Sequence, residues 1–508
     1  MDSDAAFCEL HGGLTRDKPA EPVYRVAFRE GITVQKTEQD ALTLFLPLGS
    51  VTLRETSHAL RQAICDLADG RRSVEAIHAD VSASSGTADA ARFLVHIEHF
   101  TAQGILQYRL DDDTAPVATI IPCGRGFRLQ PRPLDLSKTY TLSRFALLRR
   151  VGADICLESP LGRARVLIHG AAGAVLVSRL AAAMPAADLL RAAAGLSRAA
   201  ALGLLQLLFN AEALTSCGDA GRTAEERDPV LAQWTVADLY FHSRSRFGRQ
   251  SDHFGAVFRH IGTIPPLPAV KPPPAGKQTL LPKPDLAAVT RHDPPFTQVL
   301  ESRQSSYRFG PAPISRSQLG EFLHRSARVR WLDSTGVSRR DGVVGEDVME
   351  ITSRPYPAGG RGYDLEIYLA IDRCADIDPG LHHYDPVRHL LTCVRPADAK
   401  VERLLAYAEI AAPGCRPQVL VILASRFQRL SWKYEAIAYA TTLKHVGIVQ
   451  QTMYLVATAM GLACSALGSG DADAFAEASG SGYLIEGSVG EFILGTRAAG
   501  ADTASGGE

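Results

Sequence analysis

The sequence predicts an α+β protein in which two small winged-helix-like domains precede a larger α+β domain. Its 508 residues are too many for one hydrophobic core. One order of short strands, three helices and a closing strand occurs twice, which predicts domains at residues 23–112 and 136–218. After a proline-rich linker arm at 219–292, helical and strand-like patterns alternate from 293 to 498 and predict the third domain.

The first winged-helix-like domain is predicted from alternation and from helix-end signals. Leucines alternate with other residues within 41–53, which favours a short hairpin. Helical spacing follows, and Gly70 is placed to end the first helix, while Ser73 is placed to cap the second. A third helix stops near Gly104, and the apolar run 105–110 predicts the closing strand.

The second domain repeats this order with a hairpin within 154–168, three helices and a strand at 213–215. The arm that follows differs from both neighbours. Residues 265–284 contain eight prolines and are expected to run extended. A plain spacer is one interpretation, but the preceding residues 240–246 are too aromatic and too basic for a simple linker.

Composition excludes several classes of protein. The 54 basic and 55 acidic residues nearly cancel, so the formal net charge of -1 predicts neither nucleic-acid binding nor attraction to a membrane. The nine cysteines are scattered without zinc-site spacing, which favours free thiols in a reducing cytosol. Because no signal peptide or membrane span is recognisable, we expect a cytoplasmic protein. Residues 1–22 are predicted to be a disordered lead-in and 499–508 a flexible tail.

Two segments of the third domain suit a flat, phosphate-bearing ligand. Arg303, Ser305 and Arg308 combine guanidinium groups with a hydroxyl, a good combination for phosphate, although spacing alone favours a solvated helix end. Farther along, two prolines stiffen a turn that ends in Gly359 and Gly360. Glycines let backbone N–H groups approach a planar or anionic ligand closely, whereas an ordinary tight turn is the alternative.

In this order the motifs resemble the nitroreductase-fold FMN proteins. Within that fold they resemble the azoline dehydrogenases of thiazole/oxazole-modified peptide biosynthesis, the streptolysin-type and cyanobactin-type oxidases. The resemblance covers about residues 230–498 and implies an FMN cofactor. The cofactor-binding residues that it implies are Arg303, Ser305, Tyr307, Arg308, Pro357, Ala358, Gly359, Gly360, Gln451, Leu467, Gly468 and Arg497.

The chain departs from this family pattern at several positions. Tyr307 stands where the second arginine of the pattern is expected, so Arg308 or a second chain is a possible substitute. Ala358 replaces a serine, which removes one hydroxyl contact. Gln451 could equally be a buried structural glutamine, and Arg497 could equally face water.

The same resemblance implies a catalytic pair, Lys433 and Tyr434. Oxidation of an azoline to an azole transfers a hydride to flavin N5 and a proton to a base, after which dioxygen reoxidises the flavin. A tyrosine hydroxyl beside an ammonium group can serve as that base. Adjacent side chains on a regular helix or strand point apart, so the pair requires an irregular segment. Trp432 is placed to shield it from bulk water.

The partners implied by the resemblance are a second copy of the chain, a precursor peptide with its leader, and a cyclodehydratase. The leader would add a strand to the edge of a winged-helix-like domain, and the proline-rich arm would pack on the FMN domain. No metal site is expected, because His382 and His383 resemble part of a surface hairpin of the family.

Two rival functions remain open at this point. One is a general flavin reductase or oxidase that acts on a small molecule, which would not need two peptide-binding-like domains. The other is a peptide-docking scaffold without flavin. That rival is motivated by the departures at Tyr307, Ala358, Ala440 and Ile448.

Overall fold

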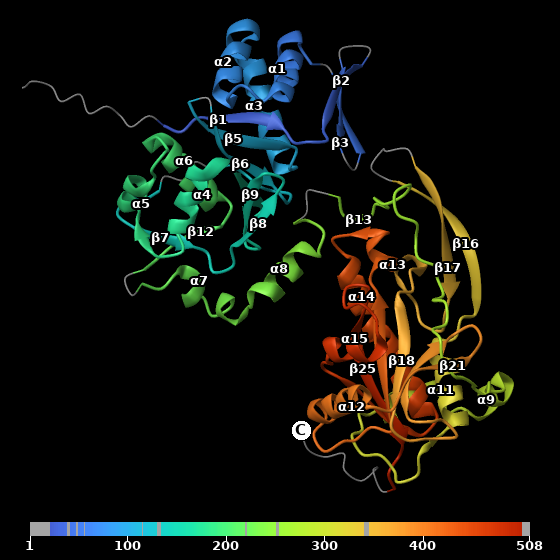
Figure 1. Ribbon diagram of the computed structural model, residues 1–508. Coiled ribbons are helices and arrows are strands. Elements are labelled where there is room, and N and C mark those ends of the chain that lie inside the picture. Colours follow the sequence, from blue (N-terminus) through green and yellow to red (C-terminus); the bar gives the residue numbers. More distant parts are fainter. Residues whose placement is uncertain are drawn as a thin grey trace, which may run out of the picture. The chain divides into compact units, whose positions relative to one another are not determined.

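The computed structural model divides the chain into two compact units, residues 1–253 and 254–508, and each is described by itself (Figure 1). The lead-in predicted for residues 1–22 and the tail predicted for 499–508 lie almost entirely outside the described residues. The described residues are 21–499, apart from 38–40, 47–48, 55, 114, 130–133, 219–220, 250–252 and 340–344.

The amino-terminal unit contains one succession of elements twice. The first succession is β1 (Tyr24–Phe28), β2 (Thr33–Thr37), β3 (Ala41–Leu46), β4 (Gly49–Leu53), α1 (His58–Asp69), α2 (Val74–Ser85), α3 (Thr87–Ala102) and β5 (Leu106–Asp112). After β6 (Ala115–Pro122), the second is β7 (Thr139–Leu142), β8 (Leu147–Val151), β9 (Asp154–Glu158), β10 (Ala164–Ile168), α4 (Gly170–Arg179), β11 (Met184–Pro185), α5 (Ala186–Ala192), α6 (Arg198–Asn210) and β12 (Leu214–Ser216). The unit ends with α7 (Ala224–Arg227), η1 (Leu231–Gln233) and α8 (Val236–Arg244).

The helix ends follow the signals in the sequence. Ser57 and Ser73 cap α1 and α2 by accepting a backbone N–H, and Ser197 does the same for α6. Gly70 ends α1 in the left-handed conformation, with φ of 62°, which a glycine adopts without strain. The predicted hairpins are present as β3–β4 and β9–β10.

The two successions close in the same way but differ in their three-stranded meanders. In the first, β1 pairs with β5, and in the second, β7 pairs with β12, in both cases antiparallel. The meander β2-β3-β4 forms a sheet of its own. The meander β8-β9-β10 instead joins β6, giving a six-stranded sheet in the order β1-β5-β6-β10-β9-β8. One hydrophobic cluster runs through both successions, and the winged-helix assignment and its boundaries stay predictions.

The carboxy-terminal unit is an α+β domain. Its elements before the long helix are β13 (Gly255–Ala256), β14 (Gln278–Leu280), α9 (Leu286–His292), α10 (Phe296–Ser302), β15 (Ile314–Ser315), α11 (Arg316–Ala327), β16 (Trp331–Ser338), β17 (Glu346–Ser353), η2 (Gly359–Arg361), β18 (Leu365–Ile371), β19 (Cys374–Ala375), β20 (Gly380–Asp385), β21 (Leu390–Pro396), α12 (Ala399–Ala411), β22 (Val419–Arg426), α13 (Gln428–Ser431) and β23 (Tyr434–Glu435). The remaining elements are α14 (Ala438–Ala459), β24 (Leu462–Leu467), α15 (Ala472–Ser479) and β25 (Glu486–Thr496).

A seven-stranded antiparallel sheet organises this unit, in the order β14-β21-β20-β18-β22-β25-β24. Helices cover both faces. Residues of α11 and α14 share one hydrophobic cluster with the sheet, and residues of α12 and α15 share another (Figure 1). Every residue of β18 and β22 is buried, because these two strands lie in the middle of the sheet under both layers.

The proline-rich arm packs on this unit, as predicted. Trp432 donates its Nε1–H to the Ile264 carbonyl, and Arg429 donates to the carbonyl of Leu267. Leu281 is buried in the core, and β14 pairs with β21 at the edge of the sheet. The arm predicted for 219–292 is divided between the units, since the carboxy-terminal unit begins at Phe254.

Two expectations from the sequence are wrong in detail. The sequence pattern places the start of a helix-like run at Gly447 and Gln451, but α14 begins at Ala438. A single exposed glycine does not end a helix whose other face is buried. His382 and His383 are not on a surface hairpin. They lie in β20 and are 3% and 1% exposed. Among the described residues, no helix has both the length and the apolar character to cross a membrane.

Candidate functional site

Gly359, Gly360, Lys433 and Tyr434 come together, and we call them the turn cluster. Gly360 has a φ of 55°, the left-handed region. Its carbonyl accepts a hydrogen bond of 2.9 Å from Lys433 Nζ. Lys433 Nζ and the Tyr434 hydroxyl both lie within 2.5 Å of the position that a Cβ at Gly360 would take. Only glycine fits here, and its absent side chain lets the ammonium and the phenol approach the same point.

The irregular backbone that the pair requires is present. Lys433 lies between α13 and β23, and Ala436 has a φ of 65°, so neither helix nor strand continues through the segment. The arm fixes it from outside. The N–H groups of Val257 and Phe258 both donate to the Lys433 carbonyl, and β13 pairs with β23. Two adjacent side chains can therefore point to one place.

An apolar layer lies beside Lys433. Trp432 is 4% exposed and packs with Phe258, Ile261, Met349 and Ile351. Lys433 itself is 9% exposed, with Nζ 5.6 Å from the centre of the Phe258 ring. The sequence predicted the shielding role of Trp432 but did not predict that of Phe258. The only sequence signal for Phe258 was its aromatic side chain just before the proline-rich stretch.

Arg303 and Ser305 meet at Tyr454, and together with Arg497 we call them the basic cluster. Ser305 Oγ is 2.9 Å from the Tyr454 hydroxyl, and the Arg303 guanidinium lies 5.3 Å from the centre of the same ring. Arg497 pairs with Phe309 in an isolated β-bridge at the end of β25. These side chains are half-buried or exposed. Guanidinium groups and a hydroxyl open to solvent suit a phosphate.

Helix α14 runs past both clusters. Near its start, His445 contacts Gly359, and near its end, Tyr454 contacts the basic cluster. The two positions are about 13 Å apart along the axis at the usual helical rise. A cleft of about 310 Å³ lies beside the helix between them, lined by Val446, Gln450, Leu467, Gly468, Ser469, Gly470, Ser488, Val489, Gly490 and Glu491.

The remaining predicted residues are distributed around these features. Leu467 and Gly468 line the cleft. Gln451 is on the exposed face of α14, not buried, whereas its neighbour Gln450 lines the cleft and donates to the Glu491 carbonyl. For the other four residues, no described side-chain contact links them to either cluster. Tyr307, Arg308 and Pro357 are exposed, and Ala358 packs against the core.

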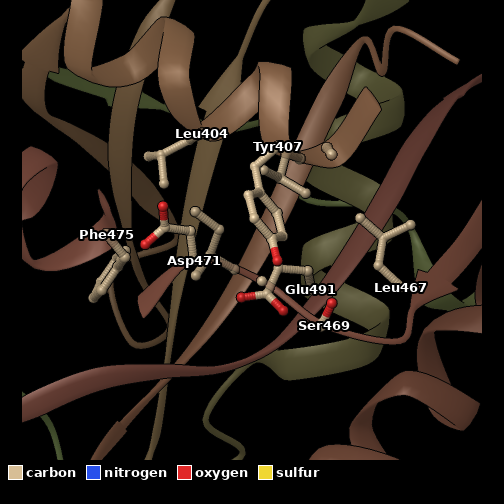
Figure 2. Close-up of a pocket in the computed structure, with 11 residues that line it drawn as sticks. Leu404, Tyr407, Leu467, Ser469, Asp471, Phe475 and Glu491 are labelled. Carbon is tan, nitrogen blue, oxygen red and sulfur yellow. The ribbon is translucent and has the colours of Figure 1, made fainter. Parts of the chain in front are cut away.

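Glu491 is a buried carboxyl that the sequence did not single out. It lines the cleft and also a second cavity of about 10 Å³, enough for one water molecule. Figure 2 shows this smaller cavity, with the hydroxyl end of Tyr407 directed toward Glu491. Burial raises the pKa of Glu491 above its usual range, although a hydrogen bond from Ser488 acts in the opposite direction.

These residues fit a flavin mononucleotide on chemical grounds. The basic cluster supplies cationic donors for a phosphate. The cleft is lined by small residues and the amide of Gln450, which suits a flat ring with polar edges. The Lys433 ammonium and the Tyr434 hydroxyl meet at the position that a Cβ of residue 360 would take, so the site also contains two protic groups close together.

Comparisons with known proteins find two family models that match parts of the chain. The nitroreductase family model matches residues 300–483, and the cyanobactin oxidase ThcOx model matches residues 140–251. The nitroreductase homologue MJ1384 of Methanocaldococcus jannaschii is 32% identical over 115 residues, which are 22% of this chain. This chain spans 57% of that relative's length.

Two solved structures show low similarity. A nitroreductase of Ralstonia eutropha is 20% identical, with a TM-score of 0.33, over 49% of this chain and 99% of that chain. The E. coli microcin synthetase McbBCD complex with truncated pro-MccB17 is 17% identical, with a TM-score of 0.30, over 39% of this chain and 72% of that chain. The amino-terminal unit thus contains a region similar to cyanobactin oxidase ThcOx, and the carboxy-terminal unit contains a region similar to the nitroreductase family.

Proposed function

We propose that the protein is an FMN-dependent dehydrogenase that oxidises thiazolines or oxazolines in a ribosomally made peptide to thiazoles or oxazoles. One observation carries the proposal: a buried ammonium and a phenol converge on Gly360 inside the region that matches the nitroreductase family. The match of the amino-terminal unit to the cyanobactin oxidase model favours a peptide substrate over a small molecule.

The residues have distinct roles in this proposal. Arg303, Ser305 and Arg497 would hold the phosphate, and the cleft would hold the ring. When bound, the flavin supplies a two-electron acceptor whose N5 takes the hydride, and dioxygen restores its oxidised form. Tyr434 would act as the base in its phenolate form, whose negative charge the Lys433 ammonium stabilises, and it would become a neutral phenol on taking the proton from the adjacent ring carbon. Trp432 and Phe258 exclude water from this transfer.

The first test is whether the purified protein binds FMN. We expect a yellow protein, or a colourless one that becomes yellow with added FMN. A protein that remains colourless at saturating FMN would instead favour a flavin-free scaffold. The second test compares an azoline peptide with and without its leader, since a general flavin reductase would not distinguish them.

The role of the pair is tested by Tyr434→Phe. Loss of a general base typically slows the chemical step by about 10²- to 10⁴-fold, so kcat should fall by at least about 10²-fold while FMN remains bound. Tyr483→Phe is the matched control, because Tyr483 is 53% exposed and has no role in the proposal. Unchanged turnover in Tyr434→Phe would remove the base assigned here.

A homodimer is part of the proposal. Tyr439, Leu443, Gly447 and Gln451 are all exposed and recur every four residues, so they share one face of α14. Tyr439 and Leu443 are 48% and 39% exposed, an apolar face that a second copy would cover. Sedimentation of the purified protein should therefore give twice the mass of one chain. A cyclodehydratase would be a further, separate partner.

The leader peptide is proposed to dock on the meander β2-β3-β4. Within the described residues, β2 and β4 pair only with β3, so both edges of this meander are open to an added strand. The second meander has one open edge, β8, because its β10 is paired with β6. Phe45 is 42% exposed on the first meander, and Leu148 is 55% exposed on the second.

This pair of exposed side chains gives a matched test. Phe45→Ser should weaken leader binding by about tenfold, as expected for loss of an apolar anchor, and Leu148→Ser should leave it unchanged. Fluorescence anisotropy with a labelled leader measures both. The reverse result would place the leader on the second meander.

A further inference from the structure

Asp364 and His445 form a buried polar pair to which the proposed function assigns no role. They are 1% and 2% exposed. His445 Nδ1 is 2.6 Å from Asp364 Oδ1. The other oxygen, Asp364 Oδ2, accepts from Ser425 Oγ at 2.7 Å and from Thr442 Oγ1 at 2.8 Å. The carboxylate is thereby held by β22 and α14 together, and it fixes the imidazole.

The second ring nitrogen of His445 reaches the turn cluster. Gly359 donates its N–H to His445 Nε2 at 2.8 Å. Because Nε2 accepts this bond, it carries no proton, and Nδ1 carries the proton that is donated to Asp364. The Gly359 N–H is consequently occupied by the protein itself. Of the two glycines, Gly360 is the exposed one.

The turn held in this way also holds the ammonium group. Gly360 follows Gly359 directly, and its carbonyl accepts the hydrogen bond from Lys433 Nζ. The Tyr434 hydroxyl and His445 Nε2 lie 3.8 and 3.5 Å from the position of a Cβ at Gly359. The chain of contacts therefore runs from Asp364 through His445 and the glycine turn to Lys433.

We propose that Asp364 and His445 are positioning residues that hold the Gly359–Gly360 turn, and through it the Lys433 ammonium, where the proton transfer takes place. The proposal rests on the proposed function of the turn cluster. An acceptor aimed at one backbone N–H is needed because a turn of two glycines has little stiffness of its own. A carboxylate that fixes the tautomer of a histidine is a known way to orient the ring.

The first experiment compares two substitutions of His445. Leucine removes the acceptor, whereas the Oε1 of glutamine can still accept from Gly359. Because small misplacements of catalytic groups can slow turnover by about 10²-fold, His445→Leu should lower kcat by about that factor, with KM for the peptide and Kd for FMN within about threefold. His445→Gln should recover at least about tenfold of the loss. His292→Leu, at an exposed histidine of α9, is the control.

Two further measurements do not depend on turnover. Hydrogen exchange of the peptide covering residues 357–361 should speed up in His445→Leu and remain slow in His445→Gln. Selective ¹⁵N-histidine NMR of the wild-type protein should show His445 protonated at Nδ1 and not at Nε2, with the resonance assigned from the glutamine variant.

The outcomes separate this inference from the proposed function. Glutamine and leucine variants that are equally impaired, equally active, or equally protected from exchange would overturn the positioning role. A proton on Nε2 would overturn it even if His445→Leu fails to fold, because that nitrogen could not accept from Gly359. If the wild-type protein oxidises no azoline, the proposed function fails. The hydrogen-exchange rate of residues 357–361 and the tautomer of His445 would still decide whether the Asp364–His445 pair holds the turn.

Discussion

The turn cluster and the basic cluster lie along the same helix but are held in opposite ways. Lys433 is buried, and its neighbours are fixed by the arm, by β13 and by the Asp364–His445 pair. In the basic cluster, Ser305 and Arg497 are exposed. The difference teaches that the groups proposed for chemistry are fixed by tertiary contacts, whereas the groups proposed for phosphate binding can adjust to the ligand.

The largest effect is expected at Gly360, where a substitution would break the turn cluster. Gly360→Ala would place a Cβ against both Lys433 Nζ and the Tyr434 hydroxyl, at a φ that disfavours side chains. We expect turnover to fall by more than about 10³-fold, since both protic groups move. The free energy of unfolding should fall by about 1–2 kcal/mol. Steady-state kinetics and denaturant unfolding measure these effects.

The control for this variant is Gly336→Ala. Gly336 lies in the exposed strand β16, its φ is not positive, and an added Cβ would meet no atom within 4 Å. This substitution should leave turnover unchanged. If Gly360→Ala and Gly336→Ala were equally active, the close approach of Lys433 and Tyr434 at Gly360 would not be needed for turnover.

A smaller effect is expected at the basic cluster. Arg303→Ala should raise the Kd for FMN by about tenfold, the loss expected for one charge-assisted hydrogen bond, and leave kcat of the saturated protein unchanged. Arg308→Ala sharpens the comparison, because Arg308 is the candidate substitute for the arginine that Tyr307 replaces. If Arg308→Ala alone weakens binding, the phosphate contact belongs to Arg308; a fall in kcat for either variant would contradict the division between the clusters.

The smallest effect is expected at Glu491, in the cleft between the clusters. Burial raises the pKa of this carboxyl, so the stability it contributes is complete below the pKa of the unfolded chain and is lost as pH rises through the higher pKa of the folded state. Glu491→Gln removes this titration. The variant should match the wild type at pH 4 and be more stable at pH 8, by about 1 kcal/mol in the free energy of unfolding.

Chemical unfolding at the two pH values provides the measurement. Glu477→Gln is a suitable control, because Glu477 is on α15 with its side chain 51% exposed and should show no such difference. If the difference in the free energy of unfolding between the wild type and Glu491→Gln is the same at both pH values, the carboxyl is better solvated than its burial indicates.

Much of the fold could be read from local signals. Ser73 and Gly70 mark helix ends in the structure as they do in the sequence, and the repeated order of elements is present in both successions. The course of α14 could not be read, because Gly447 interrupts the pattern, and only packing of the opposite face shows that the helix continues. The pairing of β10 with β6 could not be predicted from the sequence either, since strand pairing depends on partners distant in the chain.

The sequence by itself determined which residue types are present: the glycine turn, the adjacent lysine and tyrosine, and the arginine–serine motif. Their chemistry follows from the side chains alone. Only the tertiary structure decided that Lys433 and Tyr434 meet at Gly360, that Phe258 lies beside Lys433, and that Asp364 and His445 hold Gly359 from below the surface. The reason is physical: a motif fixes what a side chain can do, whereas burial and contacts between distant segments fix where it does so.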